Sequence, residues 1–207
     1  MAKPARQTAS LSRSPGRPRE FDVAKALDKA TKVFSERGFH GTSIADLTHA
    51  MNLAQGSIYK AFEDKRGLFL AALQRYRATR AEKLRKVIGA EGSGLAQLRR
   101  ALGFYVQSSH GEEGRRGCLV VTGATELSAF SRDMARDVAA AFDRNEALLM
   151  ELVRRGQKDG SIAAHIDARA AARMMLCLTQ GMRVVGKTGR TRADMQAVVD
   201  LALTAIM

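Results

Sequence analysis

Gln55, Ser57 and Lys60 are grouped in one short segment, and their side chains carry hydrogen-bonding groups that can distinguish base pairs. Glutamine pairs with the edge of adenine, and lysine with the acceptors of guanine, in a DNA major groove. Gly56 between them permits a close approach of the backbone, and the phenol of Tyr59 can donate to a phosphate oxygen. We predict that these five residues contact DNA, with Gln55, Ser57 and Lys60 setting the sequence preference. The alternative for Tyr59 is a place in the core, because its ring is amphipathic.

A second set of residues is suited to binding phosphate. Thr42 and Ser43 stand at one helix start and Lys65 near another, where free amides and the positive end of the helix dipole favour anions. Arg17 and Arg19 belong to a Ser-Pro-Gly-Arg-Pro-Arg segment that resembles the Gly-Arg-Pro core of minor-groove hooks. Such contacts fix position rather than sequence. The alternative is that the tail only adds solubility and that the lysines are solvated surface charge.

Cys118 is the residue most suited to covalent chemistry. It follows Arg115 and Arg116 and is expected to open a helix, and both neighbouring positive charge and a helix N-terminus stabilise a thiolate. A thiol of low pKa is suited to sensing electrophiles or oxidants, and we expect Lys187 to approach it as a cationic or nucleophilic partner. The alternative is that Cys118 is a small buried apolar residue. Cys177, among methionine and leucine, is expected to be structural.

The rest of the sequence must supply the elements that position these residues. All three prolines lie at or before Pro18, and alanine, leucine, arginine, methionine and glutamate dominate the remainder, a composition that favours helices over strands. Residues 1–19 form a basic tail that is expected to be disordered. Helices are predicted at residues 23–37, 44–51, 57–62, 65–88, 94–109, 118–129, 131–157, 167–186 and 191–206.

The first three predicted helices have the pattern of a helix-turn-helix head. In the first, apolar residues recur at the spacing of one buried helix face, and Gly38 then supplies the left-handed residue that ends the helix. A short helix capped by Thr42 or Ser43 is followed by a break at residues 52–56 and by a second short helix. Two short helices joined by a tight turn are typical of a helix-turn-helix.

Residues 19–73 resemble the DNA-binding part of the TetR family of bacterial transcriptional regulators. The resemblance rests on Phe34, Gly38-Phe39, Thr42-Ser43-Ile44, Ile58-Tyr59-Lys60-Ala61-Phe62, Lys65 and Leu68-Phe69. The sequence departs from the family pattern at Asn52, where glycine is usual, and at Thr48, where a small apolar residue is usual. The resemblance implies an all-α fold with a tail at residues 1–19, a helix-turn-helix DNA-binding domain at 20–66, and an effector-binding and dimerisation domain at 67–207.

The resemblance also implies partners for the C-terminal domain. The last two helices of each chain would pair with their symmetry mates in a homodimer, which fits their many methionine, leucine and valine residues. Tyr105, Thr122, Glu126 and Phe142, together with Cys118, are candidates to surround a pocket for a small-molecule or reactive effector. Effector binding would shift the dimer to a state that no longer matches adjacent major grooves. The alternative is that these residues form an ordinary intrachain core.

Charge and composition narrow the functional classes. Lysine and arginine outnumber aspartate and glutamate by 34 to 21 in 207 residues, and the net charge of +13 favours a polyanionic partner. A membrane surface is the less favoured partner because no long basic amphipathic helix with a tryptophan-rich face occurs. Without a signal peptide or a membrane-spanning stretch, a cytoplasmic location is expected. Neither a metal nor a cofactor is expected, because no Cys/His spacing or cofactor loop occurs.

These observations predict a sequence-specific transcriptional regulator, a repressor released from a palindromic operator by its effector, and not an enzyme. Two alternatives remain. A thiol redox enzyme using Cys118 is disfavoured because no Cys-x-x-Cys pair or nearby resolving partner occurs. A nonspecific architectural DNA-binding protein would be indifferent to sequence, whereas a dimeric regulator would prefer a palindrome.

Overall fold

The computed structural model describes residues 21–207, so the predicted contacts of Arg17 and Arg19 lie outside the described residues. The described part is helical and contains no strand, which confirms the all-α fold class. Within it, no helix is both long enough and apolar enough to cross a membrane. The elements are α1 (Val23–Arg37), α2 (Ile44–Met51), α3 (Gln55–Phe62), α4 (Lys65–Ile88), α5 (Gly94–Ser108), α6 (Gly111–Arg116), α7 (Leu119–Thr125), η1 (Leu127–Ala129), α8 (Arg132–Asp159), α9 (Ala168–Val185), η2 (Gly186–Thr188) and α10 (Arg192–Thr204).

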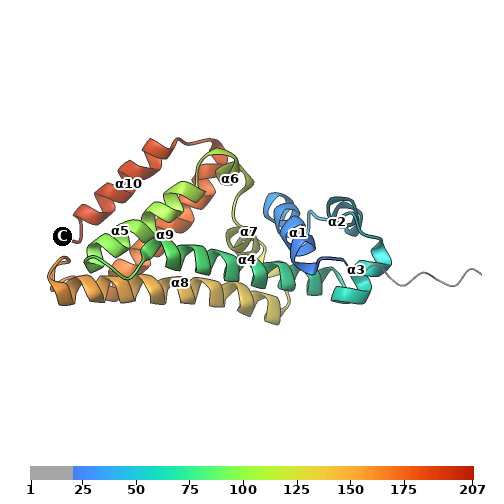
Figure 1. Cartoon of the computed structure of the whole chain (residues 1–207), viewed down its shortest axis with the longest axis horizontal. Coiled ribbons are helices and arrows are strands. Elements are labelled where there is room, and N and C mark those ends of the chain that lie inside the picture. Colours follow the sequence, from blue (N-terminus) through green and yellow to red (C-terminus); the bar gives the residue numbers. More distant parts are fainter. Residues whose placement is uncertain (1–20) are drawn as a thin grey trace, which may run out of the picture.

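The described chain is elongated, with a head formed by α1, α2 and α3 at one end (Figure 1). The long helices α4 and α8 run lengthwise away from the head, and α5 and α9 pack against α8. The outermost helix, α10, lies against α5 and α9. The short helix α7 packs against both α1 and α8, so it lies where the head meets the body.

Helix α1 forms the centre of the head. Asp22 caps it by accepting a hydrogen bond from the Lys25 amide, and Phe34 is fully buried. The helix stops at Gly38, whose φ of 77° is positive as predicted; its ψ of 177° is extended, so the stop is not the left-handed helical turn that was expected. Phe39 nevertheless folds back onto Phe34, with ring centroids 6.3 Å apart. The turn therefore directs the chain into the core of the head.

Two hydrophobic clusters form the core of the described chain. The cluster of the head contains Phe34, Ile58 and Phe69 and continues into Leu119 of α7 and Val138 of α8. The other cluster joins the far end of α4 to α5, α8, α9 and α10. Because the first cluster crosses from the head into the body, the head is packed against α7 and α8 as well as being covalently joined to α4.

The structure differs most from the predicted helices just before and after Cys118. Helix α6 was not predicted, and the helix predicted at residues 118–129 ends at Thr125 and is followed by the 3-10 turn η1. Glycines account for the broken pattern: Gly111 and Gly117 have φ values of 61° and 90°, a region that residues with a side chain rarely adopt. These turns place Cys118 at the N-cap of α7.

Candidate nucleic-acid interface and effector cavity

Helix α3 turns one apolar side chain into the head and its polar side chains outward. Ile58 is fully buried, whereas Gln55 and Lys60 are exposed and Ser57 is half-buried. Tyr59 is 40% exposed, which excludes the core position considered for it. The Gln55 Nε2 atom lies 3.4 Å from the Tyr59 Oη atom, so these two side chains share one face of the helix. The predicted base-reading and phosphate-binding side chains of α3 are therefore accessible to a partner.

Ser43 and Asp46 fix the start of α2. The Ser43 hydroxyl accepts from the Asp46 amide and the Asp46 carboxylate accepts from the Ser43 amide, which is a capping box. Hydrogen bonds from the backbone and side chain of Ser43, together with one from Arg37, lower the pKa of Asp46 to about 2. Asn52 ends α2 with a left-handed φ of 56°, which asparagine tolerates better than most residues with a side chain. The turn between α2 and α3 thus forms without the usual glycine.

Thr42 and Lys65 make internal contacts that differ from their predicted roles. Thr42 is 1% exposed and its hydroxyl donates to the carbonyl of Gly38, so burial removes this side chain from the set that can bind phosphate. The Lys65 ammonium donates to the carbonyls of Phe39 at 3.0 Å and Thr42 at 2.9 Å. It also lies 4.4 Å from the Phe39 ring centroid. Lys65 therefore stabilises the connection between α1 and α2. These two hydrogen bonds use two of its three N–H groups.

Gly56 lies in open space at the start of α3. A Cβ built on it meets no atom within 4 Å, and its φ is not positive, so neither packing nor backbone conformation in the chain requires glycine here. Ala54 precedes the helix and provides no side-chain hydrogen bond to its first amides. The backbone at this end of α3 is consequently open to close approach by an external partner.

A cavity of about 220 Å³ in the body reaches Cys118. It is lined by α4 and α8, with further contributions from α5, α7 and α9, and the aromatic part of its wall comes from Tyr76, Phe104 and Tyr105. The Tyr76 hydroxyl donates to the Cys118 Sγ atom at 3.4 Å. The structure thus brings two of the predicted effector residues, Tyr105 and Cys118, to one cavity.

Two arginines act on the Cys118 thiol. Arg183 of α9 is 1% exposed, and its Nη2 atom donates to the carbonyl of Gly117, the residue before Cys118. Arg80 of α4 lies among the aromatic rings of the cavity wall. Burial alone raises the pKa of Cys118, but the charges of Arg183 and Arg80 and the hydrogen bond from Tyr76 outweigh it and hold that pKa below its ordinary value. The nearby positive charge therefore shifts the pKa of Cys118 in the direction that favours a thiolate.

The origin of that charge differs from the prediction. Arg116 is paired with Glu36 and Glu112, so its charge is largely balanced by carboxylates. Lys187 packs beside the Cys118 segment, because a Cβ on Gly117 would lie 2.2 Å from its Cε atom. Lys187 is nevertheless exposed and does not belong to the cavity lining. The charges that act on the thiol come from helices distant in the sequence rather than from its neighbours.

Thr122 and Glu126 were predicted to line the pocket, but the structure places them where α7 meets the head. The Thr122 hydroxyl donates to the carbonyl of Ser35 at 3.2 Å, and the Glu126 Oε2 atom accepts from the Phe39 amide at 2.8 Å. Neither belongs to the cavity lining. Phe142 also lies outside it and packs on the hydrophobic cluster of the head. Thr122 and Glu126 therefore link α7 to the head.

Comparison with known proteins agrees with this arrangement. A family model described as "Bacterial regulatory proteins, tetR family" matches residues 26–72, and one described as "Tetracyclin repressor-like, C-terminal domain" matches residues 94–201. The HTH-type transcriptional repressor ComR of Escherichia coli (strain K12) is 31% identical over 96% of this chain and 94% of its own length. The chain belongs to the TetR family.

Solved structures of TetR-family proteins include similar chains on DNA. A cysteine mutant of the TetR family regulator CifR, complexed with 26-bp double-strand operator DNA, superposes with a TM-score of 0.80 at 34% identity. That match covers 93% of this chain and 100% of the CifR chain. The HTH-type transcriptional repressor BdcR of Escherichia coli (strain K12) is 33% identical over 62% of this chain and 65% of its own length. The protein is thus a sequence-specific DNA-binding transcriptional regulator and not an enzyme.

Arg80 in the cavity wall and Arg183 beside the Cys118 segment are two charged residues of this TetR-family protein that were not predicted from the sequence. For Arg183 a signal existed: it shares the helical spacing of Met175, Thr179 and Met182, all of which are buried in α9. A charged residue on such a face is informative because arginine is rarely buried without a partner. For Arg80 no comparable signal existed, because arginines recur on several faces of α4.

Proposed function

We propose that this TetR-family regulator is a repressor that binds a palindromic operator as a homodimer and releases it when an effector reaches Cys118. The observation that carries the proposal is the position of α7. Cys118 precedes this helix and lines the cavity, while Thr122 within it and Glu126 at its end are bonded to the head. A displacement of α7 by an effector would therefore reach the DNA-binding head directly. A cytoplasmic location is part of the same proposal.

In this proposal α3 enters the major groove of the operator. Gln55, Ser57 and Lys60 contact base edges, and Tyr59 contacts a phosphate, because these are the side chains that the helix leaves accessible. Ser43 stands at the exposed start of α2 and adds a second phosphate contact. Fully buried Ile58 fixes the orientation of the helix on the head.

The homodimer would form through α9 and α10. Large apolar side chains are exposed on both helices, by between 41% and 74%: Met174, Val184, Val185, Val198 and Leu201. Exposed apolar side chains concentrated on two neighbouring helices are typical of an interface between subunits. A twofold dimer would present two α3 helices to adjacent major grooves, about 34 Å apart along the DNA.

The connection between cavity and head is tight enough to transmit a small movement. A Cβ on Gly38 would lie 2.1 Å from the Glu126 Oε1 atom, so the end of α7 is in close contact with the turn after α1. Glu126 also accepts from the amide of Phe39, which packs in the core of the head. A shift of α7 would therefore turn the head and change the spacing of the two α3 helices, so that they no longer fit one operator.

Selection of bound sites from random DNA tests the operator proposal. We expect the native protein to enrich a palindrome, and Gln55→Ala to relax preference at particular bases by about 1–3 kcal/mol. Gln74→Ala on α4, also an exposed glutamine, is the control and should leave the ranking unchanged. An unchanged ranking with Gln55→Ala would remove Gln55 from the base-reading set. Enrichment of sites without twofold symmetry would count against a dimeric reader.

A charge placed on α10 tests the dimer. Leu201 is 74% exposed in the single chain, so Leu201→Asp should fold normally but give a monomer by light scattering and lose operator binding. The control is Val87→Asp on α4, where the side chain is 44% exposed outside α9 and α10 and the dimer should persist. A dimeric Leu201→Asp protein would show that subunits pair elsewhere.

Alkylation tests the role of Cys118. Iodoacetamide should modify Cys118, identified by peptide mass spectrometry, in step with the release of fluorescent operator DNA. Cys118→Ser should retain the DNA under the same treatment. Release that persists in Cys118→Ser would disprove the proposed role of this thiol.

A further inference from the structure

The lining of the cavity beside Cys118 contains several arginines and lacks acidic residues among residues 21–207. Arg77, Arg80, Arg85 and Arg144 belong to its lining, and no aspartate or glutamate among residues 21–207 does. We propose that this cavity selects a small organic anion, whose acid group is attracted by the arginines from the mouth to the Cys118 end and whose apolar body lies along the aromatic wall. The inference rests on the proposed role of the cavity as the effector site, and it adds the chemical class of the effector.

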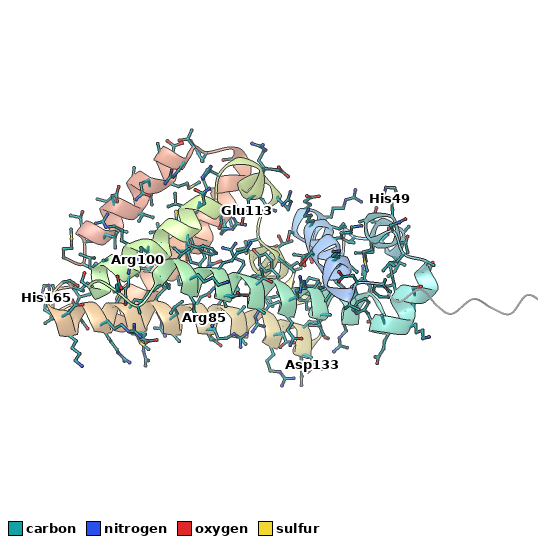
Figure 2. All side chains as sticks on the ribbon, in the orientation of Figure 1. His49, Arg85, Arg100, Glu113, Asp133 and His165 are labelled. Atoms are coloured by element: carbon teal, nitrogen blue, oxygen red, sulfur yellow. The ribbon has the colours of Figure 1, made fainter. Side chains whose placement is uncertain are left out.

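The charged residues at the mouth of the cavity are exposed to solvent. Arg85 of α4 and Arg144 of α8 are both exposed, and Figure 2 shows Arg85 where α4 runs alongside α8. Arg77 is half-buried, and its Nη1 atom donates to the backbone carbonyl of Asp137 at 3.3 Å. None of the ion pairs within residues 21–207 involves these three arginines. Their guanidinium groups can therefore bind a carboxylate, with which a planar fork of donors makes paired hydrogen bonds.

Arg183 is not part of the cavity lining but lies behind its inner end, where its charge acts on Cys118, Tyr76 and Tyr105, which do line the cavity. It is 1% exposed, its Nη2 atom bonds to Gly117, and its Nε and Nη1 atoms have no hydrogen-bond partner among the described residues. A buried guanidinium is unfavourable unless negative charge or acceptors surround it. Cys118 directly follows the residue that Arg183 binds, so the thiol end of the cavity is also positive.

The size and walls of the cavity limit the ligand further. Exposed arginines are common in a chain of net charge +13, so the buried Arg183 distinguishes this cavity from the general basic surface. Arg80 is already paired with Glu113 at 3.1 Å and stacks on Phe104 at 4.6 Å, which makes it part of the wall. The volume of about 220 Å³ is smaller than most pockets for drug-sized compounds. A carboxylate with a short alkyl chain or one aromatic ring fits these limits.

Iodoacetate and iodoacetamide provide a matched pair of probes. Both react by one step, in which the thiolate sulfur forms a bond to the CH₂ carbon while the carbon–iodine bond breaks and iodide leaves, but only iodoacetate carries a negative charge. The rate ratio of iodoacetate to iodoacetamide is measured at Cys118 by peptide mass spectrometry and compared with that of 2-mercaptoethanol. At physiological ionic strength, we expect the ratio at Cys118 to be at least about tenfold higher than the ratio for 2-mercaptoethanol. Equal ratios would overturn the proposal.

Variants separate the mouth of the cavity from the overall charge of the protein. The double variant Arg85→Gln/Arg144→Gln should lose most of the preference for iodoacetate. The double variant Arg132→Gln/Arg154→Gln removes the same charge from two exposed arginines of α8 outside the cavity lining, and it should keep the preference. Equal losses in both double variants would assign the effect to net charge and overturn the proposed site.

A reversible pair tests binding without covalent chemistry. We expect 3-phenylpropionate to protect Cys118 from iodoacetamide at concentrations where 3-phenylpropionamide does not, and equal protection would contradict anion selectivity. Operator release is measured in parallel. If Cys118 prefers the anionic probes but the operator DNA is never released, the anion site is supported and the thiol switch is disproved. If the DNA is released but Cys118 shows no preference for the anionic probes, the thiol switch is supported and the anion site is disproved.

Discussion

The positively charged side chains of α3 and those beside Cys118 differ in their exposure to solvent. Lys60 is exposed to solvent, whereas Arg183 is 1% exposed and has two nitrogen atoms without a partner among the described residues. A solvated lysine costs little folding free energy, while a buried guanidinium that is incompletely paired costs several kcal/mol. The reading face can therefore change without affecting the fold. A change at Arg183 is expected to affect the fold more, because this side chain is buried and bonds to the carbonyl of Gly117 just before α7.

Lys60→Ala tests the exposed side of this contrast and should change operator binding more than any substitution beside Cys118. Loss of a base contact should weaken operator binding by about 1–3 kcal/mol, or roughly 5- to 150-fold. The free energy of unfolding should change by no more than about 0.5 kcal/mol, because the side chain is exposed. Fluorescence anisotropy and urea unfolding measure the two quantities, with Lys83→Ala on α4 as the control for lost charge. A loss of stability as large as the loss of binding would remove the contrast between the two sites.

Arg183→Gln tests the other side of the comparison. Arg183 lowers the pKa of Cys118, so its removal raises that pKa and leaves less thiolate at neutral pH. We expect iodoacetamide to react several-fold more slowly near pH 7, and the rise of the rate with pH to move to higher pH. Arg183→Lys keeps a positive charge and should restore part of the rate, whereas a merely structural role would not distinguish the two variants. Equal pH profiles for the native protein and Arg183→Gln would show that Arg183 does not act on the thiol.

Glu126→Ala tests whether the two sites communicate through α7. It removes the acceptor of the Phe39 amide, so Cys118 should react at its native rate while operator release per alkylated subunit falls a few-fold. Glu112→Ala removes an exposed glutamate of α6 and should leave the release unchanged. If Glu126→Ala released DNA as fully as the native protein, another element would have to carry the signal.

The head was predictable from sequence because its signals are local. The end of α1 at Arg37, the capping box at Ser43 and the outward face of α3 follow from residues within a few positions of one another. Thr42 is the exception, since its burial depends on how the α1–α2 connection folds over the core. Short-range patterns thus give elements and caps but not which of two adjacent polar residues is buried.

The cavity was less predictable because five helices contribute to it. Tyr105 and Cys118 line the cavity, but Thr122 and Glu126 face the head because glycine turns after α5 and before α7 set the direction of that short helix. Arg183 reaches the Cys118 segment from 65 residues further along the chain. The direction of the seven-residue helix α7 leaves no periodic pattern in a single sequence, and a contact between residues 65 positions apart leaves none either.

Gly56→Ala separates the stability of α3 from its DNA binding by adding a single methyl group. Because a Cβ at Gly56 meets nothing within 4 Å, alanine should stabilise α3 and raise the free energy of unfolding by up to about 1 kcal/mol. The same methyl group would stand between the backbone and the DNA, so operator affinity should fall several-fold. Gly103→Ala in α5 is the matched control, since its Cβ also meets nothing, and it should stabilise without changing affinity. Native affinity in Gly56→Ala would mean that α3 reads DNA through its side chains alone, without close approach of its backbone.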